Sequence, residues 1–419
     1  MAGTDIIDRD GEKVILKGAG LGGHMNMENS ITGYPGHEHE HRKAMLKVLG
    51  PEKYKFFFDR FLDYFFTDAD AEFFASLGLN CIRVPFNYRH FEDDMDPRRC
   101  AKCNLYVILD LHSAPGGQNQ DWHSDSGINK AFFWEFKDFL DRAIDLWVEL
   151  AKRYRGNPFI AGYNPPNEPA DPEHTRLVDL PLPNCVYACH DYAIMGFPVP
   201  EQYEGTAEQK AELRSQFDRK AAYMKERNVP IWNGEWGPVY EDPLKTGKEA
   251  AETINAKRFA LLKEQLNIYR DSAASWSIWL YKDIGYQGMV YLDPESPYMK
   301  LVEPFLQKKA KYALDFWCWQ DSGVKHIYGP FIAALEEMVP ETYRKRHYPN
   351  IWPFAQHITR AVRNCVLSEF LSDEFAELFA NKTEEELEAI ASSFRLENCI
   401  MRDALNDDLK EDAALSTAK

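Results

Sequence analysis

The sequence predicts an α/β fold, a (β/α)8 barrel that lacks some of its β/α elements and is followed by a helical extension. Three observations lead to this prediction. Short β-rich runs alternate with longer segments of helical periodicity, which is typical of βαβ units around a parallel sheet. Polar or aromatic residues follow most of these runs, at the strand ends where parallel α/β folds bind ligands. Two connections are too short for a full crossover.

The β-rich runs number seven, one fewer than a complete barrel requires. They cover residues 14–19, 79–85, 105–112, 160–164, 185–190, 230–235 and 274–280. Several of the intervening segments place apolar residues on one face of a helix, and these segments are the expected outer helices of the barrel. They cover residues 52–77, 131–155, 207–227 and 249–269.

The two short connections define where elements are missing. Residues 87–103 join the second run to the third, and their central part, 93–99, has no helical stripe. Residues 170–183 lead from the fourth run to the fifth without room for a useful helix. We therefore expect the barrel to lack one helix at the first connection, and a helix, a strand and a helix at the second.

The pattern changes again near residue 317, where polar-rich helices begin, among them 371–379 and 383–390. Ser372 and Thr383 are residue types that favour the N-cap position. We predict a barrel domain over residues 1–316 and a helical C-terminal extension over residues 317–419. We expect the last residues, 407–419, to be frayed.

Composition limits the class of ligand. With 45% hydrophobic residues and ten Trp, the chain has enough apolar material for a large core. The formal net charge of -17 opposes capture of nucleic acid or of an anionic membrane surface, so a neutral ligand fits better. The N-terminus has neither a basic nor an apolar signal region, and no stretch of 18 apolar residues follows, so we expect a cytoplasmic protein without a membrane span.

Cysteine and histidine patterns give no reason to assign a metal or another cofactor. The eight cysteines stand largely in apolar contexts, and we expect free thiols. Cys100 and Cys103 form a C-x-x-C without a second pair at zinc spacing. His37, His39 and His41 alternate, but they follow Gly-Tyr-Pro-Gly, so we predict a polar loop near the barrel mouth rather than a metal site.

Two glutamates follow predicted strands in similar settings. Glu168 lies in Asn-Pro-Pro-Asn-Glu-Pro, and Glu235 lies in Trp-Asn-Gly-Glu-Trp-Gly-Pro. Cleavage of a glycosidic bond needs such a pair, because one carboxyl protonates the leaving oxygen while the other attacks the anomeric carbon. A separation of about 5 Å between the two carboxyls would imply retention of configuration.

Further motifs accompany the two glutamates in a fixed order along the chain. Arg83 lies in Cys-Ile-Arg-Val-Pro-Phe, His112 in Leu-Asp-Leu-His, His190 and Tyr192 in Cys-His-Asp-Tyr, and Trp279 in Trp-Ser-Ile-Trp-Leu-Tyr. Together these motifs resemble glycoside hydrolase family 5, whose members share eight active-site residues on a (β/α)8 barrel. The resemblance covers about residues 11–316, the expected catalytic barrel.

The resemblance implies a role for each matching residue. Glu168 would be the general acid/base and Glu235 the nucleophile, with Arg83 beside the nucleophile to keep it ionised. The other matches imply His112 under the reacting sugar, Asn167 at its 2-hydroxyl, His190 and Tyr192 as a pair whose tyrosine bonds the nucleophile, and Trp279 as the stacking platform. The implied reaction needs no cofactor.

Within the family, two stretches are similar to fungal exo-β-1,3-glucanases and their relatives. They are Leu-His-Ser-Ala-Pro-Gly-Gly-Gln-Asn at residues 111–119 and Gly-Ala-Gly-Leu-Gly-Gly at residues 18–23. This similarity implies exo action on β-glucosidic bonds of a neutral oligosaccharide, β-glucan or β-glucoside. An endoglucanase and a glucosylceramide-type hydrolase are the alternatives among enzymes.

A different class of function is also open at this point. Barrel closure couples strand number, shear and tilt, so loss of a strand would displace Glu168 relative to Glu235. The product would then be a catalytically impaired sugar-binding protein or a misassembled chain from an incomplete coding sequence. Three further residues have two possible roles each. Trp122 and His123 either line the sugar pocket or pack under a loop. Asp283 either binds sugar hydroxyls or caps a loop.

Overall fold

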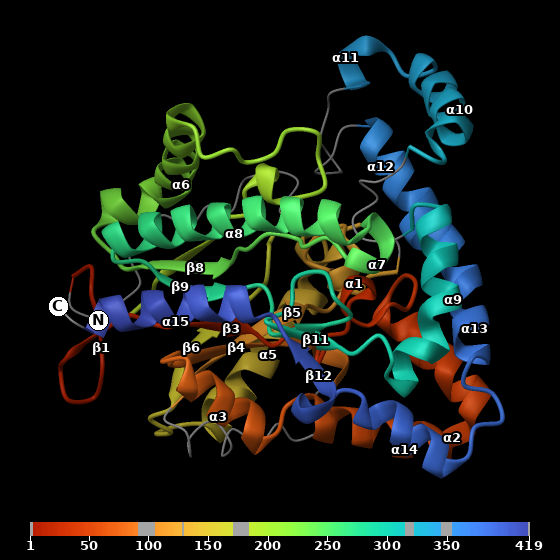
Figure 1. Ribbon diagram of the computed structural model, residues 1–419, viewed down its shortest axis with the longest axis horizontal. Helices are drawn as coiled ribbons and strands as arrows, with labels where there is room; N and C mark the ends of the chain where they lie inside the picture. Colours follow the sequence, from red (N-terminus) through yellow and green to blue (C-terminus); the bar gives the residue numbers. More distant parts are fainter. Residues whose placement is uncertain are drawn as a thin grey trace.

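The computed structural model of the chain describes residues 3–90, 105–127, 130–170, 184–314, 322–344 and 354–417. Residues 93–99, Cys100, Cys103 and most of the 170–183 connection lie outside these ranges. Within them, the main sheet is parallel and has seven strands in the order β6-β5-β4-β3-β9-β8-β7 (Figure 1). The strands are β3 (Lys17–Gly20), β4 (Cys81–Asn87), β5 (Tyr106–Ser113), β6 (Ile160–Asn164), β7 (Tyr187–His190), β8 (Ile231–Glu235) and β9 (Ser275–Ile278).

This strand order confirms the predicted incomplete (β/α)8 barrel. The first strand, β3, pairs with both β4 and the last strand, β9, as the first and last strands of a closed barrel do. β6 and β7 follow each other in the chain but lie at the two ends of the sheet. The opening between them, here called the seam, is where the sequence predicts a missing strand.

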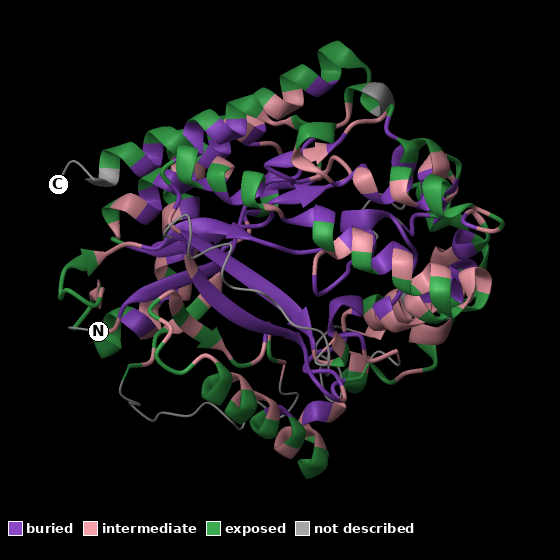
Figure 2. Ribbon diagram, turned by 90° about the horizontal axis from the view of Figure 1, so that it is seen from below, coloured by how far each residue is buried: buried purple, intermediate pink, exposed green. Residues whose placement is uncertain are grey.

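Side-chain alternation divides the strands between the barrel interior and the helical layer. In β4, Ile82 and Val84 belong to the large core shared with the helices, whereas Cys81 belongs to a small cluster with Leu16, Ile108 and Trp232. Arg83 lies two residues beyond Cys81 and therefore shares its face. The small apolar cluster fills the barrel interior below the polar residues, and the strands around it are buried (Figure 2).

The outer helices agree with the prediction except in the first region. α6 (Ala207–Arg227) has the predicted bounds, α8 (Lys248–Asp271) lies within two residues of them and α5 (Lys137–Arg153) within six. The prediction of a single helix over residues 52–77 is wrong. The structure has α2 (Glu38–Phe65), in which Gly50 has non-helical backbone φ and ψ angles, and then α3 (Asp68–Ser76). Thr67 forms a capping box with Asp70, which starts the second helix.

The predicted loop at His37, His39 and His41 is also wrong, because α2 begins at Glu38. The acidic residues of its first turn favour a helix start, since they complement the positive end of the helix dipole. Glu38 accepts hydrogen bonds from the Met27 amide at 3.0 Å and from Arg42 Nε at 2.7 Å. His39 Nδ1 lies 2.6 Å from Asp125 Oδ1, so this helix start anchors the loop that follows β5.

The C-terminal part is helical, as predicted, and packs along the barrel (Figure 1). After α9 (Pro297–Lys311), which still belongs to the predicted barrel domain, the elements are α10 (Lys325–Glu337), α11 (Glu341–Arg344), α12 (Phe354–Arg360), a π-helix (Ala361–Leu367), α13 (Ser368–Glu377), α14 (Glu384–Ser392), β12 (Cys399–Met401) and α15 (Asp403–Thr417). β12 joins a small sheet with β10 (Lys282–Asp283) and β11 (Val290–Leu292). The domain boundary near residue 317 stays a prediction.

Two details of the extension differ from expectation. The chain end is not frayed up to Thr417, because Leu409 and Asp412 of α15 are buried and Asp412 forms ion pairs with Lys17 and Arg270. Thr383 is an N-cap, but Ser372 lies inside α13, where its hydroxyl donates to the Ser368 carbonyl. None of the described helices combines the length and apolar character that crossing a membrane requires.

Part of α5 is exposed, and none of the described residues covers it. Ile144 and Val148 on this helix are 58% and 43% exposed, although the helix is strongly amphipathic. In a complete barrel such residues would pack against the next β/α unit. Their exposure agrees with the missing elements.

Exposure on α5 leads to a stability prediction. We expect Ile144→Glu and Val148→Glu to change the free energy of unfolding by no more than about 0.5 kcal/mol each, because surface substitutions rarely cost more. Phe217→Ala is the matched control on α6, where the side chain is fully buried, and should cost about 3–5 kcal/mol. Urea denaturation measures both. Destabilisation by the glutamates comparable to that of Phe217→Ala would mean that α5 is covered in solution.

Candidate active site

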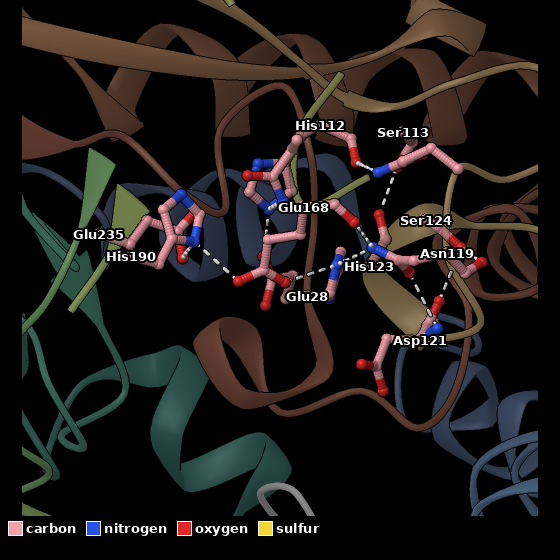
Figure 3. A network of polar contacts seen from close by, with 12 residues as sticks. Glu28, His112, Ser113, Asn119, Asp121, His123, Ser124, Glu168, His190 and Glu235 are labelled. Atoms are coloured by element: carbon pink, nitrogen blue, oxygen red, sulfur yellow. Dashed lines mark hydrogen bonds and ion pairs between the residues drawn. The ribbon is translucent and has the colours of Figure 1, made fainter. Parts of the chain in front are cut away.

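All eight residues predicted from the sequence meet at the carboxyl ends of the strands. Arg83 lies in β4 and His112 in β5, whereas Asn167 and Glu168 follow β6. His190 ends β7 and Glu235 ends β8, where the two residues pair in register. Tyr192 and Trp279 follow β7 and β9. Figure 3 shows Glu168 between His190 and His123, with Glu235 beside His190.

Glu235 is buried and held by three side chains. Arg83 Nη1 donates to its Oε1 at 2.6 Å, and the Tyr192 hydroxyl donates to its Oε2 at 2.9 Å. His190 Nδ1 lies 3.5 Å from Oε2. Burial, together with the Glu235 charge, holds the pKa of Tyr192 well above its usual range, so the phenol keeps its proton and acts as a donor. The carboxylate is therefore fixed in one orientation.

Arg83 connects the strands that carry the acidic residues. Its Nη2 donates to Asn167 Oδ1 at 2.6 Å and lies 3.0 Å from Asp110 Oδ2. Burial alone would lower the pKa of the guanidinium, but Asp110 and Glu235 raise it, and the group stays charged. Burial would likewise raise the pKa of Asp110, but Arg83 lowers it. The result is a buried cluster of paired charges beneath the pocket.

His112 is a buried imidazolium with a carboxylate on each side. Its Nδ1 lies 2.7 Å from Asp110 Oδ2, and its Nε2 lies 3.1 Å from Glu28 Oε1. Burial opposes the charge, but the hydrogen bonds to Asp110 and Glu28 outweigh it and raise the pKa of His112 to about 10. The ring stacks on Trp279 with a centroid distance of 5.3 Å and an interplanar angle of 3°. These two rings form one wall of the pocket.

Glu168 lies nearer the opening and has a strained backbone. Its φ of 41° is in the left-handed region, which costs free energy for a residue other than glycine and recurs at functional sites. His190 Nδ1 lies 2.7 Å from its Oε1, and His123 Nε2 lies 3.3 Å from its Oε2. The Glu168 side chain is 36% exposed and that of Glu235 is 6% exposed, so solvent reaches mainly Glu168.

The two histidines set the charge of Glu168. Burial would raise the pKa of its carboxyl, but the hydrogen bonds and charges of His123 and His190 outweigh burial and lower the pKa well below its usual range. Burial would lower the pKa of His123, but Glu168 raises it. The charges of the Glu168 carboxylate and of His123 are therefore coupled in the free site.

The two glutamates are close together. One ligand atom each of Glu168, His190 and Glu235 lies within 4.8 Å of the other two. The missing strand therefore does not separate the carboxylates of Glu168 and Glu235 in this structure. These three groups could also hold a cation, but Arg83 at 2.6 Å from Glu235 opposes one.

A pocket of about 340 Å³ opens above this pair. It is lined by Glu28, His112, Asp121, His123, Glu168, Tyr192, Ile194, Phe197, Gln216, Glu235, Trp279 and Arg360. His123 thus lines the pocket, whereas Trp122 is buried behind it. Asp283 caps a loop, since it accepts hydrogen bonds from the amides of Gly285 and Gln287. The described cysteines, Cys81, Cys185, Cys189 and Cys399, are free, as predicted.

Sequence reasoning missed several residues of the site. Asp110 had a detectable signal, because it stands two residues before His112 and therefore shares its face of β5. Glu28 and Asp121 stand in loops without a motif of their own. Arg360 comes from the C-terminal extension, and no local pattern connects it to the barrel.

Comparisons with known proteins agree with the fold and identify the family. The family Cellulase (glycosyl hydrolase family 5) matches residues 57–180 and 175–284, in two pieces that meet at the second short connection. A β-xylosidase of Phanerodontia chrysosporium is 48% identical, with 99% of this chain and 98% of that protein covered. Their alignment runs over 467 residues, more than the 419 of this chain, so the fungal protein contains stretches that this chain lacks.

More distant relatives match shorter parts. A probable glucan 1,3-β-glucosidase A of Emericella nidulans is 29% identical, covering 39% of this chain and 45% of that protein. An endogalactoceramidase structure is 15% identical, with a TM-score of 0.44 and coverage of 68% of this chain and 74% of that one. The family match and the extended 48% identity show that this chain belongs to glycoside hydrolase family 5.

Proposed function

We propose that the protein is a retaining β-glycosidase that cleaves β-glucosidic bonds, with Glu168 as general acid/base and Glu235 as nucleophile. The observation that carries this proposal is the pair of carboxylates whose nearest oxygens lie within 4.8 Å. Retaining enzymes hold their carboxyls about 5–5.5 Å apart, whereas inverting enzymes need about 6.5–9.5 Å to admit a water molecule. The spacing supports double displacement.

The surroundings of Glu235 suit a nucleophile. Arg83 holds one oxygen by a hydrogen bond, and the Tyr192 hydroxyl holds the second oxygen, so one oxygen lone pair can be directed at the anomeric carbon. Attack forms the carbon–oxygen bond to Glu235 while the bond to the leaving oxygen breaks. The leaving oxygen receives the proton of Glu168. Water then attacks the glycosyl-enzyme, gives its proton to Glu168 and releases Glu235.

The surroundings of Glu168 suit a proton exchange. A general acid must hold a proton, yet His123 and His190 lower the pKa of Glu168 in the free site. The proton therefore rests mainly on the His123 imidazole, whose pKa Glu168 raises, before the sugar enters. When the sugar displaces water, the charged carboxylate of Glu168 and the charged imidazolium beside it become less favourable. A proton then shifts to Glu168, from which the leaving oxygen can take it.

This arrangement predicts a pH effect. His123→Gln removes a charge and a hydrogen bond that lower the pKa of Glu168, so that pKa should rise. Because activity requires protonated Glu168, the high-pH limb of kcat/KM should move to higher pH. The pH profile of aryl glycoside hydrolysis measures this shift, with the exposed His326→Gln as control. A limb that stays in place or moves to lower pH would contradict the assignment of Glu168.

The pocket supports binding of a terminal sugar and therefore exo action. Trp279 offers an apolar ring beside the catalytic pair, and the Asn167 amide lies between Arg83 and His112. The size of the pocket suits a small ligand. The name of the Emericella relative, a glucan 1,3-β-glucosidase, agrees with a glucose unit at this position.

A β-xyloside is the second candidate substrate, because the relative that is 48% identical is named a β-xylosidase. Xylose has the ring hydroxyls of glucose but lacks the hydroxymethyl group. Initial rates on 4-nitrophenyl β-D-glucoside and β-D-xyloside separate the candidates, and NMR of the first product tests retention. A higher kcat/KM for the xyloside would reassign the substrate. First formation of the α-anomer would overturn the retaining mechanism.

A catalytically impaired sugar-binding protein is the candidate from another class, and the seam favours it because Glu168 and His190 come from opposite sides of this opening. Glu168 follows the edge strand β6 and His190 ends the edge strand β7, and the hydrogen bond of 2.7 Å between them joins the two edges. A folded protein that binds glucose yet hydrolyses neither aryl glycoside would support this candidate.

A further inference from the structure

The C-terminal extension reaches the pocket through Arg360, the last residue of α12. Arg360 lines the pocket together with Asp121, although 239 positions separate these two residues in the chain. Both side chains are largely buried, with exposures of 20% and 18%. The extension is therefore part of the pocket wall rather than a separate appendage.

Arg360 has two contacts on the loop that follows β5. Its Nη1 donates to Asp121 Oδ1, and its Cζ lies 5.7 Å from the centre of the Trp122 ring. The guanidinium thus combines an ion pair with a cation–π contact, a combination that suits Arg better than Lys. Burial raises the pKa of Asp121, and Arg360 opposes this effect. Without Arg360, the buried Asp121 carboxylate would lie near Glu168 and Glu28 and would lose the larger of two opposing charges, the other being that of His123.

The same loop holds His123 against the proposed acid/base. The Asp121 amide donates to Asn119 Oδ1 at 2.9 Å, and the Ser124 hydroxyl donates to the Asp121 carbonyl at 2.8 Å. Asn119 Nδ2 lies 2.9 Å from His123 Nε2 and donates to the Glu168 carbonyl at 3.1 Å. Figure 3 shows this network extending from Asp121 to Glu168.

We propose that Arg360 is a positioning residue for Glu168: it fixes the loop at Asp121 and Trp122 so that His123 and Asn119 hold the acid/base in place. This inference rests on the proposed role of Glu168. It gives the C-terminal extension a part in proton transfer at a site formed by the barrel. Arg360 does not need to touch the sugar for this role.

The test is the dependence of the rate on the leaving group. The dinitrophenolate group of a 2,4-dinitrophenyl glycoside can leave without a proton, whereas the methoxy group of a methyl glycoside needs a proton from the acid. We expect Arg360→Ala to lower the pH-independent kcat/KM roughly tenfold or more on the methyl glycoside, since small misplacements of catalytic groups are costly, and less than about threefold on the dinitrophenyl glycoside. Asp121→Asn should show the same selectivity, and Arg360→Lys an intermediate one.

Arg344→Ala is the matched control, because Arg344 lies in α11 of the same extension and donates to the Val339 carbonyl instead. It should leave both rates unchanged. Equal losses by Arg360→Ala and Asp121→Asn on the two substrates, or no loss, would overturn the inference while wild-type activity and the Glu168 assignment stand. If the proposed function itself fails, the wild type will hydrolyse neither substrate. Should Arg360→Ala not fold, Asp121→Asn and Arg360→Lys give the same comparison.

Discussion

Glu235→Gln is expected to abolish hydrolysis of an aryl β-glucoside, with a fall in kcat of about 10⁵-fold or more, the size of loss that removal of a nucleophile causes in other covalent hydrolases. The amide cannot attack the anomeric carbon, although it fills the same volume. It also removes the charge that pairs with Arg83 at 2.6 Å. Measurement of kcat and KM on the same substrate tests this expectation.

Glu226→Gln on the exposed surface of α6 is the control for this substitution and should retain full activity. Circular dichroism and the midpoint of thermal unfolding should show that both variants are folded. Retention of substantial activity by folded Glu235→Gln would mean that another group is the nucleophile.

Glu168→Ala is expected to lower activity in a manner that depends on the leaving group. The loss should be about 10²–10⁴-fold on a methyl or phenyl glycoside, the usual contribution of general acid catalysis, and small for the first step on a dinitrophenyl glycoside. Since Glu168 would also activate water in the second step, the glycosyl-enzyme should accumulate. Rate measurements with several leaving groups, with and without azide, test both steps.

Azide should restore turnover of the Glu168→Ala variant, because this anion attacks the glycosyl-enzyme without a general base. The expected product is the β-glycosyl azide. Equal losses on all leaving groups, without rescue by azide, would assign the acid/base role to another residue.

The fold was predictable where local pattern and chain length decide it. Seven strands appear where the β-rich runs stand, and the length of the 170–183 connection alone indicated the break between β6 and β7. The start of α2 was missed because Gly50 and Pro51 suggest a helix break, yet the helix continues past a kink. The burial of α15 was missed because its partners, Lys17 and Arg270, lie far away in the chain.

The eight site residues were predictable because each stands in or shortly after a β-rich run of the sequence. The partners that tune them were harder to see. Glu28 and Asp121 come from loops, and Arg360 comes from a helix beyond the barrel, so only the folded chain places them at the pocket. The proximity of Glu168 to Glu235 could not be predicted from the sequence, because β6 and β7 are neighbours in the chain but lie at opposite ends of the sheet.

The most direct test of this account is to trap the covalent intermediate. A 2-deoxy-2-fluoro glycoside with a dinitrophenyl leaving group, made with the sugar that the enzyme cleaves faster, should inactivate the protein and add one glycosyl unit to its mass. Peptide mapping should locate that unit on Glu235 in Trp-Asn-Gly-Glu-Trp-Gly-Pro. A label on any other residue, or turnover of the natural glycoside without any label, would contradict the assignment of Glu235 as nucleophile.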